Sequence, residues 1–202
     1  MIEKVLHDMI VLTGFSEDDS RVLRETADVT ATWAEEFSQA FYDLLFSYEP
    51  TARVFREGER PAREASLKAW YDGVIHGNFT PEFWQQQWVV GLIHIARQVT
   101  NPYMLGMTSR VQQLFLHKCL ETFELEQAEA VYGAFKRATD VVAGLVTEGY
   151  FQNYMQAMER VAGFRKALIV RMLDMEIRQM LEDAGVKLSV DDWSSGKYQA
   201  NQ

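Results

Sequence analysis

The stretch WYDGVIHGNFTPEFWQQQWVVGLIHIARQVTNPYMLGM, residues 70–107, decides the fold of this chain. It holds the pairs Thr80-Pro81 and Asn101-Pro102, in which a capping side chain directly precedes a proline. Proline is tolerated in the first turn of a helix and ends a helix elsewhere, so each pair predicts a helix start. We therefore expect one helix over 81–98 and a second over 102–122, separated by a tight corner.

Outside this stretch, apolar residues recur at spacings of three and four, and no sustained alternation of apolar and polar residues is present. The sequence predicts an all-α chain of eight or nine helices. Besides the two above, helices are expected over 3–12, from 17, through 33–48, and over 61–75, 125–160 and after Gly163. We expect one domain over 1–162, an additional C-terminal helix within 163–186 and a flexible tail over 187–202.

Composition limits the compartment and the partners. The 202 residues carry 29 acidic and 20 basic side chains, a net charge of −9, with no basic run that would favour nucleic acid or an anionic membrane surface. The longest apolar runs, 88–93 and 167–170, are far shorter than a membrane span. A single cysteine, Cys119, excludes an intramolecular disulfide. We expect a cytoplasmic protein whose partners are neither nucleic acid nor membrane.

Motifs of common enzymes are missing: the sequence has no GxSxG, HExxH, glycine-rich phosphate loop or CxxC. Of its four histidines, His7, His76 and His117 read as surface or helix-end residues. His94 differs, because Gly91 and Val90 precede it by three and four residues on the same helix face. A flat macrocycle or another helix could approach there. From this geometry alone, a core histidine bonded to a backbone carbonyl remains the alternative.

The order of these residues resembles the sensor-globin and protoglobin group. That group has a small residue three before a histidine and a proline eight after it, positions held here by Gly91, His94 and Pro102, with Tyr103 and Gly106 following. Upstream, the Phe41-Tyr42-Asp43 run in AEEFSQAFYDLLFSYEPTARVF, residues 34–55, is similar to the distal helix of the family. The resemblance covers about 16–154 and implies a globin-like helical fold with extra helices at both ends.

The resemblance also implies a haem b cofactor. His94 would be the proximal ligand of the iron, with its other ring nitrogen bonded to a backbone carbonyl one turn earlier. Tyr42 would donate a hydrogen bond to an iron-bound gas, Arg97 would pair with a haem propionate, and Ser66 or Leu67 would be the second distal residue. The other expected pocket residues are Phe41, Phe46, Trp70, Val74, Val90, Gly91, Met104, Met107 and Val111. No histidine lies in the distal helix before Ile75, so a second histidine ligand is not expected.

The sequence departs from the family in two places. Residues 97–100, Arg-Gln-Val-Thr, lack the glycine that the family has at the helix corner. The resemblance therefore does not predict the backbone conformation of these four residues. The 48 residues after Tyr154, 155–202, are too few for a kinase, cyclase or methyl-accepting output domain. We therefore expect either a globin that acts alone or one whose output is a single extra helix and an unidentified partner protein.

Three functions fit this sequence. The main hypothesis is a haem globin that reversibly binds O2, CO or NO, as a gas or redox sensor and not as an enzyme. The first alternative is a haem-dependent redox enzyme, such as a nitric-oxide dioxygenase or a peroxidase-like protein. The second is a helical interaction module without a cofactor.

The sequence predicts a homodimer with a two-fold, four-helix interface, in which the 125–160 helix pairs with its symmetry mate and with the 102–122 helix. Its apolar stripe is accompanied by Gly133, Ala134 and Gly144, small residues that permit close helix approach. The stripe consists of Ala128, Val131, Phe135, Ala138, Val142 and Leu145. The alternative is that the final helix covers this stripe within one chain, through Leu173, Ile177 and Leu181.

Overall fold

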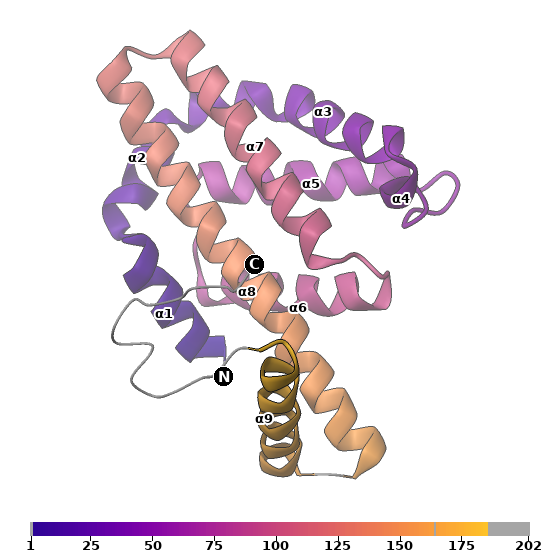
Figure 1. The fold of residues 1–202 in the computed structure, drawn as a ribbon. Helices are drawn as coiled ribbons and strands as arrows, with labels where there is room; N and C mark the ends of the chain where they lie inside the picture. Colours follow the sequence, from indigo (N-terminus) through magenta and orange to yellow (C-terminus); the bar gives the residue numbers. More distant parts are fainter. Residues whose placement is uncertain (1, 164, 186–202) are drawn as a thin grey trace. The chain divides into compact units, whose positions relative to one another are not determined.

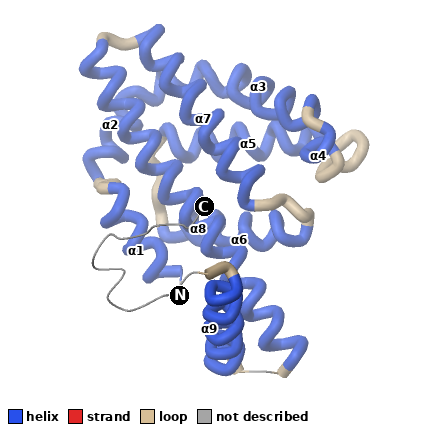
Figure 2. Tube along the Cα trace, viewed as in Figure 1, coloured by secondary structure: helices blue, strands red, loops and turns tan. Residues whose placement is uncertain are grey.

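The computed structural model describes residues 2–163 and 165–185, and this part of the chain contains helices and loops but no strand (Figure 2). The expected all-α architecture is confirmed. The helices are α1 (Ile2–Thr13), α2 (Glu17–Thr30), a 3-10 turn (Ala31–Trp33), α3 (Ala34–Ser47), α4 (Glu49–Ala52), α5 (Arg60–Ile75), α6 (Pro81–Ala96), α7 (Asn101–Thr122), α8 (Leu125–Ala162) and α9 (Lys166–Asp183). They form two compact units, residues 1–151 and 152–202.

Both proline pairs begin helices. The Thr80 hydroxyl accepts a hydrogen bond from the amide of Phe83 at 3.2 Å, and Pro81 is the first residue of α6. In α7 the cap is Thr100 and not Asn101, so that helix begins one residue before the predicted start and Pro102 lies within its first turn. Helix α6 ends at Ala96 instead of 98. These shifts are of the size expected at frayed helix ends.

The core of the first unit is aromatic. Phe115 of α7 and Phe135 of α8 stack with ring centroids 3.8 Å apart, and Phe37 of α3 and Tyr71 of α5 pack beside them. In Figure 1, α3 and α5 lie side by side and α7 runs past α3. The Tyr71 hydroxyl donates to the carbonyl of Thr30 at 2.8 Å, so its polar end is satisfied inside the core.

The apolar stripe of α8 lies in this core and not on the surface. Five of its six members are fully shielded from solvent by the first unit itself: Ala128, Val131, Phe135, Ala138 and Leu145. The Sδ atom of Met9 in α1 lies 2.5 Å from where a Cβ on Gly144 would be, so this glycine admits α1 and not a second copy. The expectation that a dimer partner or the final helix covers the stripe is therefore wrong.

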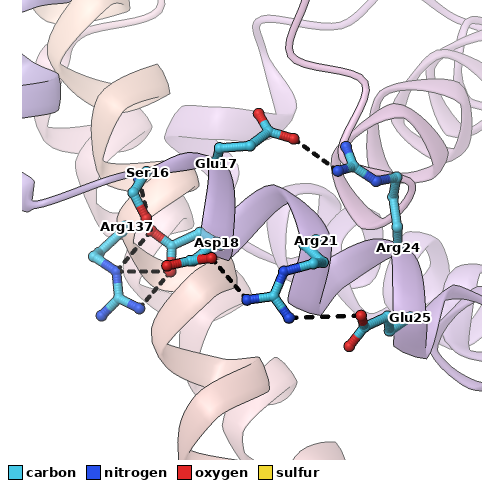
Figure 3. A network of polar contacts seen from close by, with 8 residues as sticks. Ser16, Glu17, Asp18, Arg21, Arg24, Glu25 and Arg137 are labelled. Atoms are coloured by element: carbon cyan, nitrogen blue, oxygen red, sulfur yellow. Dashed lines mark hydrogen bonds and ion pairs between the residues drawn. The ribbon is translucent and has the colours of Figure 1, made fainter.

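A polar contact joins the start of α2 to the middle of α8 (Figure 3). Asp19 is buried, and its carboxylate accepts hydrogen bonds from Arg137, from Nε at 3.1 Å and from Nη2 at 2.5 Å. The same carboxylate accepts the amide of Ser16, the residue that caps α2, at 2.9 Å. Asp19 thus caps its own helix and binds α8 at once.

The second unit contains the end of α8 and helix α9. Lys166 donates from its backbone amide to the Glu159 carboxylate at 3.0 Å and from Nζ to the Gln152 amide oxygen at 2.8 Å. The final helix is therefore present, while the predicted tail, 187–202, falls outside the described residues. None of the helices described is long and apolar enough to cross a membrane.

Candidate functional site

A cavity of about 430 Å³ lies inside the first unit, within the size range of small-molecule and cofactor sites. Helices α3, α5, α6, α7 and α8 all contribute to its wall. Most of the side chains that line it are apolar, which favours a ligand with a large hydrophobic surface.

Eleven of the fourteen residues predicted for the pocket line this cavity. They are Phe41, Tyr42, Ser66, Leu67, Trp70, Val90, His94, Arg97, Met104, Met107 and Val111. The structure thus brings together side chains from four helices that are up to 70 positions apart in the sequence.

The other three predicted residues lie elsewhere. Phe46 packs beside the cavity, against Phe55 at a centroid distance of 4.9 Å. Val74 is fully buried in the aromatic core. Gly91 faces α8, where a Cβ atom would lie 3.0 Å from the Val146 carbonyl oxygen. Of the two groups expected to approach Gly91, a flat macrocycle or another helix, the structure places a helix there, α8.

The sequence reasoning missed thirteen lining residues, three of them on a helix that it had assigned another role. Thr139, Val142 and Val146 come from α8, which had been assigned to dimerisation. The others are Leu45, Thr51, Val54, Phe55, Arg63, Gln87, Ile93, Val99, Tyr103 and Thr108. Val54 and Phe55 belong to the quoted 34–55 segment and could have been found there.

His94 lies in the last turn of α6 and is the only histidine among the lining residues. Burial lowers the pKa of its imidazole to about 4, because the charged form loses its hydration. Its Nδ1 atom is buried and makes no hydrogen bond to any described residue, so the expected bond to a backbone carbonyl is not formed. The ring is therefore neutral at physiological pH and keeps a lone pair for a metal ion.

Tyr42 of α3 has its hydroxyl engaged. It donates a hydrogen bond to the backbone carbonyl of Arg63 in α5 at 3.0 Å. Burial raises the pKa of the phenol to about 12, so Tyr42 stays protonated and keeps its single donor. The side chain lines the cavity as predicted, but a ligand inside would have to compete with the Arg63 carbonyl for that proton.

An ion-pair cluster joins three residues that lie beside the cavity. The guanidinium of Arg97 contacts both oxygens of Glu59, at 2.6 and 2.8 Å, and Arg63 approaches the same carboxylate at 2.9 Å. The hydrogen bond from Arg97 is the main reason why the pKa of Glu59 falls to about 2. Two guanidinium groups thus share one carboxylate in this cluster.

The helix corner without a glycine is closed by Gln98. Its φ angle is 60°, in the left-handed region that usually favours glycine, and its amide donates to the Ile95 carbonyl at 3.0 Å. The next amide, of Val99, donates to the carbonyl of His94 at 2.9 Å. A left-handed turn therefore follows α6 despite the missing glycine, at some conformational cost.

The described residues contain no group of three or more histidine, cysteine, aspartate or glutamate side chains that could hold a metal ion. Among the residues that line the cavity, His94 alone is of these four types, so a metal bound by it would need further ligands, which a cofactor can supply. A haem would supply such ligands from its macrocycle, and His94 would hold its iron through the imidazole. The chemistry of the site fits this group.

Comparison with known proteins places the chain in a family. The model of the protoglobin family matches residues 2–156, and no curated protein matches. Among solved structures, the globin domain of a Geobacter sulfurreducens globin-coupled sensor aligns with 71% of this chain and 96% of its own, at 17% identity and a TM-score of 0.66. At that identity the likeness shows the globin-like fold. The family match covers the first unit and the lining residues, and the chain belongs to the protoglobin family.

Proposed function

We propose that this chain is a haem-binding globin that reversibly binds a diatomic gas, with His94 as the protein ligand of the iron. The observation that carries the proposal is a single neutral histidine on the wall of an apolar cavity. Membership of the protoglobin family implies a haem globin, and the cavity is built from residues within the matched range.

The surrounding side chains suit an amphipathic macrocycle. Apolar residues of α3, α6 and α7, among them Leu45, Val90 and Val111, offer contact to its faces and keep water from them. The guanidinium groups of Arg63 and Arg97 lie at the same cavity and exceed the charge of Glu59 by one, which favours the propionates. The bound haem would supply the open coordination position at which a gas binds.

Haem titration tests the proposal. Wild-type chain should bind one equivalent and give the absorption spectrum of a histidine-ligated haem, and His94→Ala should lose that spectrum or release the haem rapidly. His117→Ala is the matched control, because His117 is exposed on α7 and does not line the cavity. A His94→Ala variant with an unchanged five-coordinate ferrous spectrum would refute the assignment.

We propose that the protein binds the gas reversibly and does not convert it to a product. The described cavity offers the imidazole of His94 and two phenols, Tyr42 on α3 and Tyr103 on α7, of which Tyr42 donates to the Arg63 carbonyl. Repeated oxygenation and deoxygenation without loss of the ferrous form is the expected result with O2, and CO and NO should bind as well. Rapid consumption of NO by the oxygenated form would instead assign the protein to the dioxygenase class.

We also propose that the chain forms a homodimer through the outward faces of α7 and α8. The inward stripe is not available, but Leu105 and Leu120 of α7 and Leu125 at the start of α8 are exposed. Sedimentation equilibrium should show a dimer that Leu120→Glu dissociates. A monomer at every concentration would exclude this assembly.

A further inference from the structure

Helices α6 and α8 cross at unusually close range. A Cβ atom on Gly91 would lie 3.0 Å from the Val146 carbonyl oxygen and 3.7 Å from the Cα of Gly149. On the other side of the crossing, a Cβ on Gly149 would lie 3.7 Å from the Trp88 carbonyl oxygen. Two glycines thus let the backbones approach, which limits how far each helix can rotate against the other.

This crossing brings His94 next to Tyr150. His94 is three residues after Gly91 on α6, and Tyr150 directly follows Gly149 on α8. Residues three or four apart share a helix face, so both rings lie one turn beyond the close contact between Gly91 and Val146. Their ring centroids are 6.2 Å apart with planes inclined by 51°, and Tyr150 is 6% exposed.

The Nδ1–H group of His94 needs a hydrogen-bond acceptor. Nδ1 of His94 is buried without a hydrogen bond to any described residue, and a buried donor left unsatisfied costs about 1–3 kcal/mol. The carbonyl of Val90, one turn earlier, accepts the backbone amide of His94 if the helix is regular. A phenol oxygen is the polar group of the ring that packs nearest, and it can accept from an N–H group.

We propose that Tyr150 is the positioning residue of His94: its hydroxyl accepts a hydrogen bond from Nδ1–H when Nε2 binds iron. The proposal rests on the haem function above. Such a bond places the proton on Nδ1 and the lone pair on Nε2, fixes the rotation of the ring, and raises the basicity of the ligand.

The test compares Tyr150→Phe with wild-type protein loaded with haem. The iron–histidine stretching vibration of the ferrous, gas-free form should move to lower wavenumber, because the imidazole becomes a weaker donor. Haem transfer to excess apomyoglobin should become about tenfold faster, the lower end of the effect of removing a partner of a metal-bound histidine. Thermal unfolding of the haem-free variant shows whether the fold is intact.

Tyr103→Phe is the matched control. Tyr103 also lines the cavity, from α7, but no ring contact between it and His94 is present among the described residues. The vibration should stay unchanged in this variant. Tyr150→Leu, which also removes the ring, should change the vibration in the same direction as Tyr150→Phe.

The outcomes separate the inference from the function on which it rests. If wild-type protein binds no haem, the proposed function fails and the role of Tyr150 falls with it. If haem binds through His94 and Tyr150→Phe leaves both the vibration and the transfer rate unchanged, only the role of Tyr150 is overturned. A shift in Tyr103→Phe alone would assign the acceptor to α7.

Discussion

The hydroxyl of Tyr42 and the carbonyl of Arg63 are joined by a 3.0 Å hydrogen bond that links α3 to α5 across the cavity wall. The phenol has one proton to donate. A gas bound inside the cavity can receive it only if the Arg63 carbonyl gives it up, so the net benefit is the difference between two hydrogen bonds.

Tyr42→Phe should therefore speed O2 release by a limited factor. A bond to a polarised oxygen contributes about 1.5–3 kcal/mol, and the displaced neutral bond about 1 kcal/mol, which leaves about 0.5–2 kcal/mol or roughly 2- to 30-fold in rate. CO is less polar, so its release should change by less than about twofold. Stopped-flow ligand displacement measures both rates, and equal changes for the two gases would mean that Tyr42 does not donate to the ligand.

Ser66→Ala is the control for that experiment. Ser66 lines the cavity on α5, but its hydroxyl donates to the Ala62 carbonyl of its own helix at 2.9 Å. We expect neither O2 nor CO release to change when this hydroxyl is removed. A large change in O2 release would instead make Ser66 the distal donor.

The carboxylate of Glu59 should make stability depend on pH in the acid range. Its pKa is lowered from an ordinary 4.5 to about 2, chiefly by Arg97, so the unfolded chain takes up a proton at a higher pH than the folded chain. The stabilisation is fully present above about pH 4.5 and disappears as pH falls to about 2. Glu59→Gln mimics the protonated carboxyl, so its urea midpoint should lie below that of the wild type at pH 7 and approach it towards pH 2.5. A gap that stays constant with pH would disprove this role.

The sequence predicted residues that line the cavity where the pattern lies within one helix. Thr80 and Pro81 set the start of α6, and the spacing of Gly91, His94 and Pro102 is a local pattern that survives in the structure. The face on which His94 lies follows from the helical period alone. These features needed no knowledge of how the helices pack.

The contacts between helices could not be predicted in the same way. Glu59 and Arg97 are 38 positions apart, and Tyr150 is 56 positions from His94. No helical period connects such residues, because their meeting depends on the crossing of helices and not on spacing within one. The stripe of α8 shows the same limit: its period predicted an apolar face correctly, but not whether the chain itself or a second copy buries that face.

Gly91→Val should destabilise the protein and weaken haem binding. The new side chain would press on the Val146 carbonyl, 3.0 Å from the Cβ position, and overpacking of this kind costs about 1–3 kcal/mol. Urea unfolding of the haem-free chain measures the loss. Gly106→Ala on α7 is the matched control, because no atom of the described residues lies within 4 Å of its Cβ position; it should gain about 0.5–1 kcal/mol from helix propensity. Equal effects of the two substitutions would show that the α6–α8 crossing is not tight.

The ion pair between Asp19 and Arg137 should contribute to stability more than the exposed pairs around it. The Asp19 side chain is 7% exposed and that of Arg137 is 38% exposed, so solvent weakens the pair and we expect less than the 3–5 kcal/mol of a fully buried one. Asp19→Ala, which also removes the acceptor of the Ser16 amide, should lose about 1–3 kcal/mol. Asp18→Ala, whose carboxylate pairs with Arg21 in solvent, should lose less than about 0.5 kcal/mol. Urea unfolding measures both losses. The single variants Asp19→Ala and Arg137→Met and their combination together give the coupling energy, and a coupling near zero would show that the Ser16 cap alone accounts for the loss of Asp19→Ala.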